Sequence, residues 1–106
     1  MRNAYPAIGH KVIVDFGRMS FELTFIDGER MSFTGQSGTF EGTEETVFYT
    51  AVEIRPMVFM VYWKEPNTTN ANVVHVQDFE KGIVYTNISM PDQSFTNLKG
   101  SIRIVR

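Results

Sequence analysis

One acidic residue, Glu65, stands at the end of a stripe of large apolar side chains. Residues 58–65 read VFMVYWKE, and side chains of a β-strand point alternately to its two faces, so Phe59, Val61, Trp63 and Glu65 share one face. A carboxylate is an unusual choice for a core, whereas at the mouth of a pocket it can accept a hydrogen bond or move a proton. The spacing therefore predicts a pocket with Glu65 at its mouth.

His75 is the second side chain that could titrate in such a pocket. On a strand it lies on the same face as Ala71 and Val73, that is, it has the same parity. A Glu65–His75 pair across adjacent antiparallel strands is geometrically possible. Simpler interpretations remain open for each residue. Glu65 could be a solvated or turn-capping carboxylate, Trp63 a core residue, and His75 an isolated strand histidine.

Other familiar chemical motifs are missing from the sequence. The chain has no cysteine, which excludes disulfides and thiolate chemistry, and its two histidines show no metal-ligand spacing. Gly35-x-x-Gly38 lacks the lysine of a phosphate-binding loop, and Gly-x-Ser-x-Gly does not occur. We therefore expect no metal site and no cofactor.

Period-two alternation of apolar and polar residues runs through almost the whole chain, and no helical period is found. Asp27-Gly28 is the strongest hairpin signal, and residues 35–38 suggest a flexible break. For residues 46–54 the buried face stays undecided between Thr46, Phe48, Thr50, Val52, Ile54 and Val47, Tyr49, Ala51, Glu53. Strands are predicted at 11–16, 20–26, 30–34, 46–54, 57–64, 71–79, 83–90 and 98–105, with a short segment at 39–42.

Short connections between these strands favour sequential antiparallel pairing, since parallel pairs need crossovers of about a dozen residues. A long series of hairpins loses its exposed edges most simply by closing on itself. We therefore predict an all-β fold, a single up-and-down antiparallel barrel of eight or nine strands, lipocalin-like, as one domain over residues 1–106. The N-terminal stretch through Tyr5-Pro6 could cover one end.

Composition limits the partners. Charged residues are 21% of the chain and the net charge is −2, so no attraction to nucleic acid is expected. No segment approaches the ~20 apolar residues of a membrane helix and no signal peptide is visible, which predicts a cytoplasmic protein without membrane contact. Apolar residues that cannot all face one cavity favour a homodimer: Phe48, Val52, Val58, Met60 and Tyr62.

Several segments resemble a branch of the calycins. Residues 8–13 (IGHKVI), 21–25 (FELTF) and 61–66 (VYWKEP), with Thr69 following, are similar to bacterial phenolic acid decarboxylases. The Trp-x-Glu strand and the later segment 76–82 (VQDFEKG) resemble MoaF-like domains, named after molybdenum-cofactor biosynthesis protein F. This resemblance implies a small calycin barrel and covers most of the chain.

The decarboxylase chemistry implied by the first resemblance does not carry over. Of its four functional groups, the glutamate falls on Glu65, but the two tyrosine positions fall on Val14 and Phe16 and the arginine position on Gly42. Val14 and Phe16 have no polar side-chain atom that could hydrogen-bond to the phenol or the carboxylate of a phenolic acid. We therefore reject phenolic acid decarboxylase activity for this chain.

The sequence thus favours a barrel that binds a compact aromatic or apolar small molecule. Two alternatives remain: an isomerase- or lyase-type enzyme with Glu65 as general acid/base, and a protein-interaction module with a filled barrel. The expected ligand-binding residues are Phe16, Phe21, Phe59, Val61, Trp63, Glu65, Val73 and His75.

Overall fold

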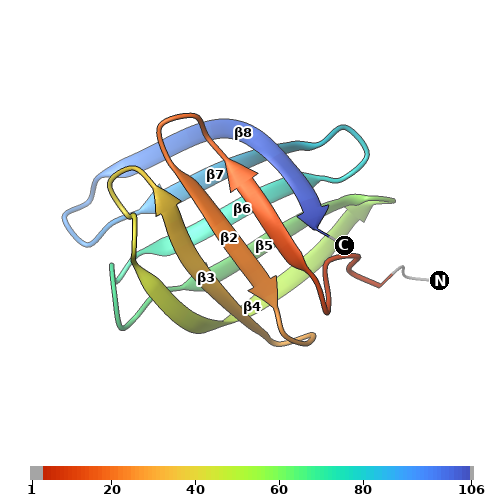
Figure 1. Ribbon diagram of the computed structural model, residues 1–106, viewed down its shortest axis with the longest axis horizontal. Coiled ribbons are helices and arrows are strands. Elements are labelled where there is room, and N and C mark those ends of the chain that lie inside the picture. Colours follow the sequence, from red (N-terminus) through yellow and green to blue (C-terminus); the bar gives the residue numbers. More distant parts are fainter. Residues whose placement is uncertain (1–3, 106) are drawn as a thin grey trace.

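The computed structural model describes residues 4–105, which form one closed β-barrel (Figure 1). Each strand pairs antiparallel with the next along the chain, and the last strand pairs with the first. The predicted all-β, up-and-down antiparallel barrel is therefore confirmed. Its eight strands are β1 (Lys11–Asp15), β2 (Ser20–Phe25), β3 (Arg30–Ser37), β4 (Glu44–Arg55), β5 (Val58–Lys64), β6 (Asn72–Asp78), β7 (Ile83–Ser89) and β8 (Phe95–Val105).

Alternation along each strand separates an inward from an outward face. In β5, Trp63 is buried and its neighbour Tyr62 is exposed, as the sequence predicts. In β4, where the sequence left two faces open, Val47 and Tyr49 are buried while Phe48 is exposed. The barrel interior therefore receives the odd-numbered residues of both strands, because the two strands pair with Tyr49 opposite Trp63.

The largest differences from the expected strand boundaries are at three places. The break expected at 35–38 is wrong, because Gly35 and Ser37 still belong to β3. The short strand expected at 39–42 is also wrong, since these residues form a turn that folds back on β3. The last strand begins earlier than expected, at Phe95. Its first three residues are all exposed, so they carry no alternation signal, but they pair with the end of β7.

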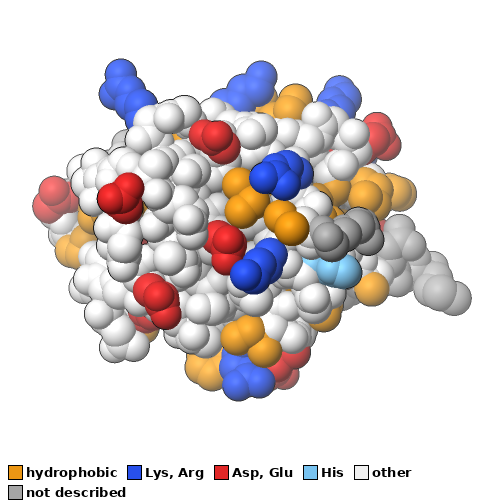
Figure 2. All heavy atoms as spheres, in the orientation of Figure 1, with side chains coloured by type: hydrophobic (Ala, Val, Ile, Leu, Met, Phe, Trp, Pro, Cys, Tyr) orange, Lys and Arg blue, Asp and Glu red, His pale blue; other side chains and the backbone are white. Residues whose placement is uncertain are grey.

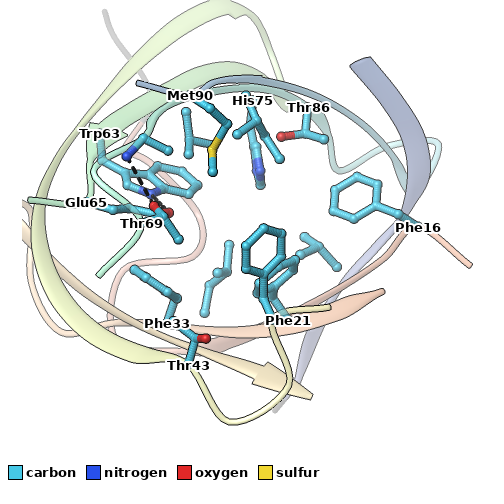
Figure 3. A pocket seen from close by; sticks show the side chains of 16 residues that line it. Phe16, Phe21, Phe33, Thr43, Trp63, Glu65, Thr69, His75, Thr86 and Met90 are labelled. Atoms are coloured by element: carbon cyan, nitrogen blue, oxygen red, sulfur yellow. Dashed lines mark hydrogen bonds between the residues drawn. The ribbon is translucent and has the colours of Figure 1, made fainter. Parts of the chain in front are cut away.

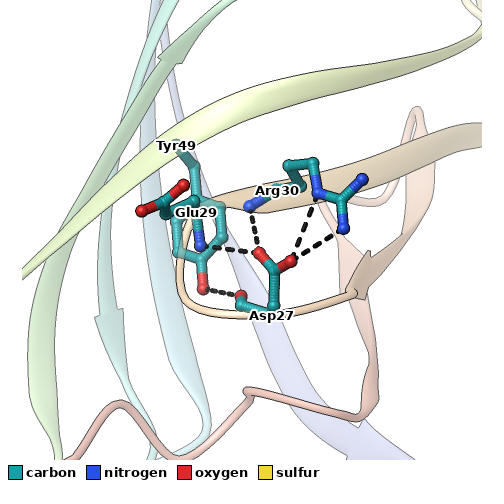
Figure 4. Close-up of polar contacts among 4 residues, drawn as sticks. All are labelled: Asp27, Glu29, Arg30 and Tyr49. Atoms are coloured by element: carbon teal, nitrogen blue, oxygen red, sulfur yellow. Dashed lines mark hydrogen bonds and ion pairs between the residues drawn. The ribbon is translucent and has the colours of Figure 1, made fainter.

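The Asp27-Gly28 turn joins β2 to β3, as predicted. One carboxylate oxygen of Asp27 accepts hydrogen bonds from the backbone N–H groups of Glu29 and Arg30, both at 2.8 Å (Figure 4). The other carboxylate oxygen pairs with the Arg30 guanidinium at 2.9 Å, and these bonds hold the pKa of Asp27 below its ordinary value. The Tyr49 hydroxyl donates to the Asp27 carbonyl at 2.6 Å, which ties the turn to β4.

The N-terminal segment closes the end of the barrel at which this turn lies. Tyr5 is only 7% exposed, and its ring meets those of Phe25, Phe59 and Phe79 at centroid distances of 5.1, 5.2 and 5.8 Å. Ala7 is completely buried. The prediction that the stretch through Tyr5-Pro6 covers one end is confirmed. The opposite end is therefore the one through which a ligand could enter.

The outer surface carries mixed charges. Acidic and basic side chains are interspersed on the face shown in Figure 2.

Large apolar side chains are exposed along the outside of β4 and β5: Phe48 is 75% exposed, Ile54 57% and Tyr62 41%. Within residues 4–105, no helix is long and apolar enough to span a membrane.

Candidate functional site

A cavity of about 40 Å³ lies inside the barrel, toward the end opposite Tyr5 (Figure 3). Side chains from the inner faces of six strands, β1, β2, β3, β5, β6 and β7, surround it, and the loops after β1, β3, β5 and β7 contribute at its mouth. The wall is mostly aromatic and aliphatic. Its lining residues are Val14, Phe16, Phe21, Leu23, Phe33, Phe40, Thr43, Trp63, Glu65, Thr69, Ala71, Val73, His75, Thr86, Ile88 and Met90.

Six of the eight residues predicted to contact a ligand lie on this wall. They are Phe16, Phe21, Trp63, Glu65, Val73 and His75. The other two, Phe59 and Val61, point inward but lie outside the cavity wall. Phe59 packs against Tyr5 at the closed end, and Val61 is completely buried in the core between the two ends. Strand parity correctly places both inside the barrel, but it does not give their height along the barrel axis.

Glu65 is buried and held by two neighbours. Its Oε2 accepts a hydrogen bond from Trp63 Nε1 at 2.8 Å, and its Oε1 accepts one from the Thr69 hydroxyl at 2.6 Å. Burial raises the pKa of Glu65, while these two hydrogen bonds and the negative charge of Glu45 contribute smaller, partly opposing effects. Glu65 thus joins the end of β5 to the turn after it and also presents a carboxyl group to the cavity.

Glu45 supports the same turn from outside the cavity wall. Its Oε2 accepts from the Asn67 backbone N–H at 3.0 Å, and its Oε1 accepts from the Thr68 hydroxyl at 2.7 Å. This second carboxylate was not predicted from the sequence, although Glu45 lies on the same face of β4 as Val47 and Tyr49. The polar turn 66–70 is therefore fixed by two glutamates, of which only Glu65 reaches the cavity.

His75 is buried in the wall but does not pair with Glu65. The Glu65–His75 pair that the sequence left possible does not form, because His75 lies opposite Val61 in the β5–β6 ladder and the Trp63 ring contacts both groups. The Trp63 and His75 rings meet edge to face, with centroids 4.8 Å apart. The imidazole is thus held by an aromatic neighbour on the cavity side.

A buried hydrogen-bond relay sets the tautomer of His75. The Tyr5 hydroxyl donates to Gln77 Oε1 at 2.5 Å, and Gln77 Nε2 lies 3.1 Å from His75 Nδ1. Because the amide oxygen already accepts, the amide N–H donates to Nδ1. Complete burial lowers the pKa of His75 to about 3, so the ring is neutral and its proton is on Nε2. Gln77 was not predicted from the sequence, although it lies two residues after His75 and therefore on the same face of the strand.

Thr86 is a polar residue of the wall that was not predicted from the sequence. It lies directly opposite His75 in the β6–β7 ladder and is 2% exposed. Among the described residues, its hydroxyl is a buried side-chain polar atom without a hydrogen-bond partner. The alternation of Val84, Thr86 and Ile88 in the predicted strand 83–90 could have placed it inside.

Buried His75 makes stability depend on pH. An unfolded chain protonates this ring near its ordinary pKa of 6.5, whereas the folded chain does so only near 3. The contribution of His75 is therefore fully present above pH 6.5 and is lost as pH falls toward 3, by up to about 1.4 kcal/mol per pH unit. We expect the free energy of unfolding, measured by urea denaturation from pH 7 to 5, to fall less steeply in His75→Gln than in the wild type.

A second buried group of the cavity wall, Glu65, also makes the free energy of unfolding depend on pH. Glu65 has the opposite sign: its raised pKa gives a contribution present at low pH and lost as pH rises through that pKa, so it offsets part of the acid slope. Equal slopes for His75→Gln and the wild type would contradict a neutral buried His75.

Comparison with known proteins identifies the family. The sequence matches the MoaF-like family over residues 8–103. The chain belongs to the MoaF-like family. Among solved structures, one from Burkholderia vietnamiensis, described as that of "a putative beta-lactamase", is similar with a TM-score of 0.88 and 25% sequence identity. The alignment covers 98% of this chain and 100% of that chain. No curated protein matches the sequence.

The MoaF-like barrel keeps its acid but has an apolar wall where the decarboxylase resemblance implies tyrosines. Val14 and Phe16 both line the cavity, and neither offers a polar atom. Gly42, at the position implied for the arginine, lies in the turn before β4 and outside the cavity wall. The polar groups of this MoaF-like cavity are therefore Glu65, His75, Thr86 and the threonines at its mouth, Thr43 and Thr69.

Proposed function

We propose that this MoaF-like barrel binds a compact, partly aromatic or apolar small molecule in its cavity. The observation that carries the proposal is an interior space with an aromatic and aliphatic wall and a few polar groups that converge on it. Small-molecule sites have this composition, because apolar contacts supply affinity and a few polar groups fix orientation. Because the N-terminal segment closes the other end of the barrel, we expect a ligand to enter between the loops at the mouth of the cavity.

The size of the cavity restricts the ligand. A buried water needs roughly 10–15 Å³ of such space, so the cavity of about 40 Å³ holds about three waters as it stands. Anything as large as a benzene ring must displace side chains of the wall. Phe21 and Met90 lie near the mouth and are only half-buried, so they are the side chains we expect to move.

Trp63 provides a direct measurement, because it is the single tryptophan of the chain and its ring lines the cavity. We expect a bound ligand to change Trp63 fluorescence and to raise the melting temperature by mass action. The panel comprises small neutral aromatics, hydroxycinnamates, other aromatic acids and pterins. We expect Glu65→Gln to change the affinity for a bound compound several-fold, since the carboxyl group lies at the wall.

Glu45→Gln is the matched control for that substitution. Both glutamates hold the turn 66–70, but only Glu65 lines the cavity. An effect confined to Glu65→Gln would support binding in the cavity. Equal effects of both substitutions would assign the change to the turn, and a panel without any binder would contradict the proposed function.

An enzymatic role for Glu65 remains the second candidate. The specific observation in its favour is that burial raises the pKa of a carboxyl group at a cavity wall. An isomerase or lyase that used Glu65 as general acid/base would lose about 10²–10⁴-fold in rate in Glu65→Gln. Because both carboxylate oxygens already accept hydrogen bonds from Trp63 and Thr69, we favour binding over catalysis.

The activity in the description of the Burkholderia structure is not carried over to this chain. Serine β-lactamases use a serine nucleophile with a lysine nearby, and the described residues lining this cavity include neither type. An interaction module without a ligand, a homodimer through the outer face of β4 and β5, and a cytoplasmic location stay predictions from the sequence.

A further inference from the structure

The unpaired hydroxyl of Thr86 indicates what kind of ligand the cavity takes. A buried hydroxyl that bonds to nothing is unfavourable, and native structures rarely keep one without a reason. Thr86 lines the cavity beside His75 (Figure 3). Its hydrogen-bonding capacity is therefore directed to whatever occupies the space in front of it.

His75 supplies a second group at the same place. Residues directly opposite each other on antiparallel strands have Cβ atoms roughly 4.5–5.5 Å apart, so one small group can reach both side chains. The relay from Tyr5 through Gln77 occupies His75 Nδ1 as an acceptor and leaves Nε2–H as a donor. A ligand atom at this place must therefore accept a hydrogen bond.

The charges of the wall restrict the ligand further. Among residues 4–105, those that line the cavity include no lysine and no arginine, so an anion bound there would lose its hydration without gaining a counter-charge from them. Glu65, the acidic residue of the wall, would also repel it. A cationic amine could pair with Glu65, but an ammonium group has no lone pair to accept from His75.

We propose that the cavity binds an uncharged molecule through a carbonyl or hydroxyl oxygen that accepts from His75 Nε2–H and Thr86 Oγ1–H. The rest of the molecule lies against the aromatic wall formed by Phe21, Phe33 and Trp63. This inference rests on the proposed binding function and narrows its ligand class to neutral amides, ketones and alcohols.

Four compounds that share a ring and differ in one group test the inference: benzamide, benzoate, benzylamine and toluene. Binding is followed through the indole N–H resonance of Trp63, which detects millimolar affinities and has no overlap in a single-tryptophan chain. We expect benzamide to bind at least about tenfold more tightly than benzoate or benzylamine. Thr86→Val, which keeps the side-chain shape, should weaken benzamide about 5- to 10-fold and leave toluene unchanged, as expected for one lost hydrogen bond.

Thr86→Ser is the rescue variant, because it keeps the hydroxyl, and it should retain benzamide binding. Melting temperatures without ligand check that all variants fold. If benzoate binds as tightly as benzamide, or if Thr86→Val leaves benzamide affinity unchanged, this inference is overturned while the proposed function stands. If none of the four compounds perturbs the Trp63 resonance, binding in the cavity fails, and the inference fails with it.

Discussion

Replacing Gly35 with alanine should destabilise the barrel by about 3 kcal/mol or more, because the new methyl group meets backbone atoms that cannot rotate away. A Cβ at Gly35 would lie 1.9 Å from the carbonyl oxygen and 2.6 Å from the carbonyl carbon of Phe40. The turn 39–42 folds directly over this glycine: Gly35 N–H donates to Thr43 at 2.8 Å, and Gly42 N–H donates to Gly35 at 2.9 Å.

The same substitution should also disturb the cavity. Phe40 and Thr43 line it, and the Phe40 ring packs beside that of Phe21 at 6.2 Å. A turn displaced by the methyl group would move these side chains away from the mouth. Ligand binding by Gly35→Ala is therefore expected to weaken even where the variant is still folded.

Urea denaturation followed by Trp63 fluorescence measures the effect, and Gly28→Ala is the control. A Cβ at Gly28 would meet only the terminal methyl of Ile8, at 4.0 Å. We expect Gly28→Ala to change the free energy of unfolding by less than about 1 kcal/mol. Similar free energies of unfolding for the two variants would show that the turn 39–42 can move away from the new methyl group without loss of stability, and would contradict this prediction.

Tyr5→Ala is the second substitution for which we expect a large effect, a loss of about 3–5 kcal/mol, as for other large aromatic side chains removed from a core. The Tyr5 ring fills the closed end between Phe25, Phe59 and Phe79. Its removal leaves a space there and takes the hydroxyl donor away from Gln77. Thermal and urea denaturation measure this loss.

Tyr5→Phe separates the two contributions. It keeps the ring and removes the hydroxyl, so it should cost only about 1–3 kcal/mol, the penalty for one unsatisfied buried acceptor. It also releases Gln77 from its fixed orientation, so the His75 N–H signals should change in this variant. If Tyr5→Ala is no less stable than Tyr5→Phe, the N-terminal segment does not serve as part of the core.

Much of this architecture could be predicted from the sequence, because a strand has only two faces. Alternation put Trp63 and Glu65 on one face of their strand, and that face is buried; the short turns between strands favoured sequential antiparallel pairing, which the barrel has. A closed barrel follows from these two facts, since closing removes the exposed edges. The MoaF-like resemblance rested on the Trp-x-Glu strand and on residues 76–82, and that strand borders the cavity with Trp63 and Glu65.

Only the tertiary structure decided the position of each inward residue along the barrel axis. That height depends on the register between neighbouring strands, to which bulges such as the one between Ser20 and Phe21 contribute. Register put Phe59 at the closed end, set Trp63 between Glu65 and His75, and brought Thr86 opposite His75. The sequence by itself determined that the barrel has polar groups inside it. The pairing of strands far apart in sequence determined which of them meet, because side-chain contacts across a barrel are set by register and not by parity.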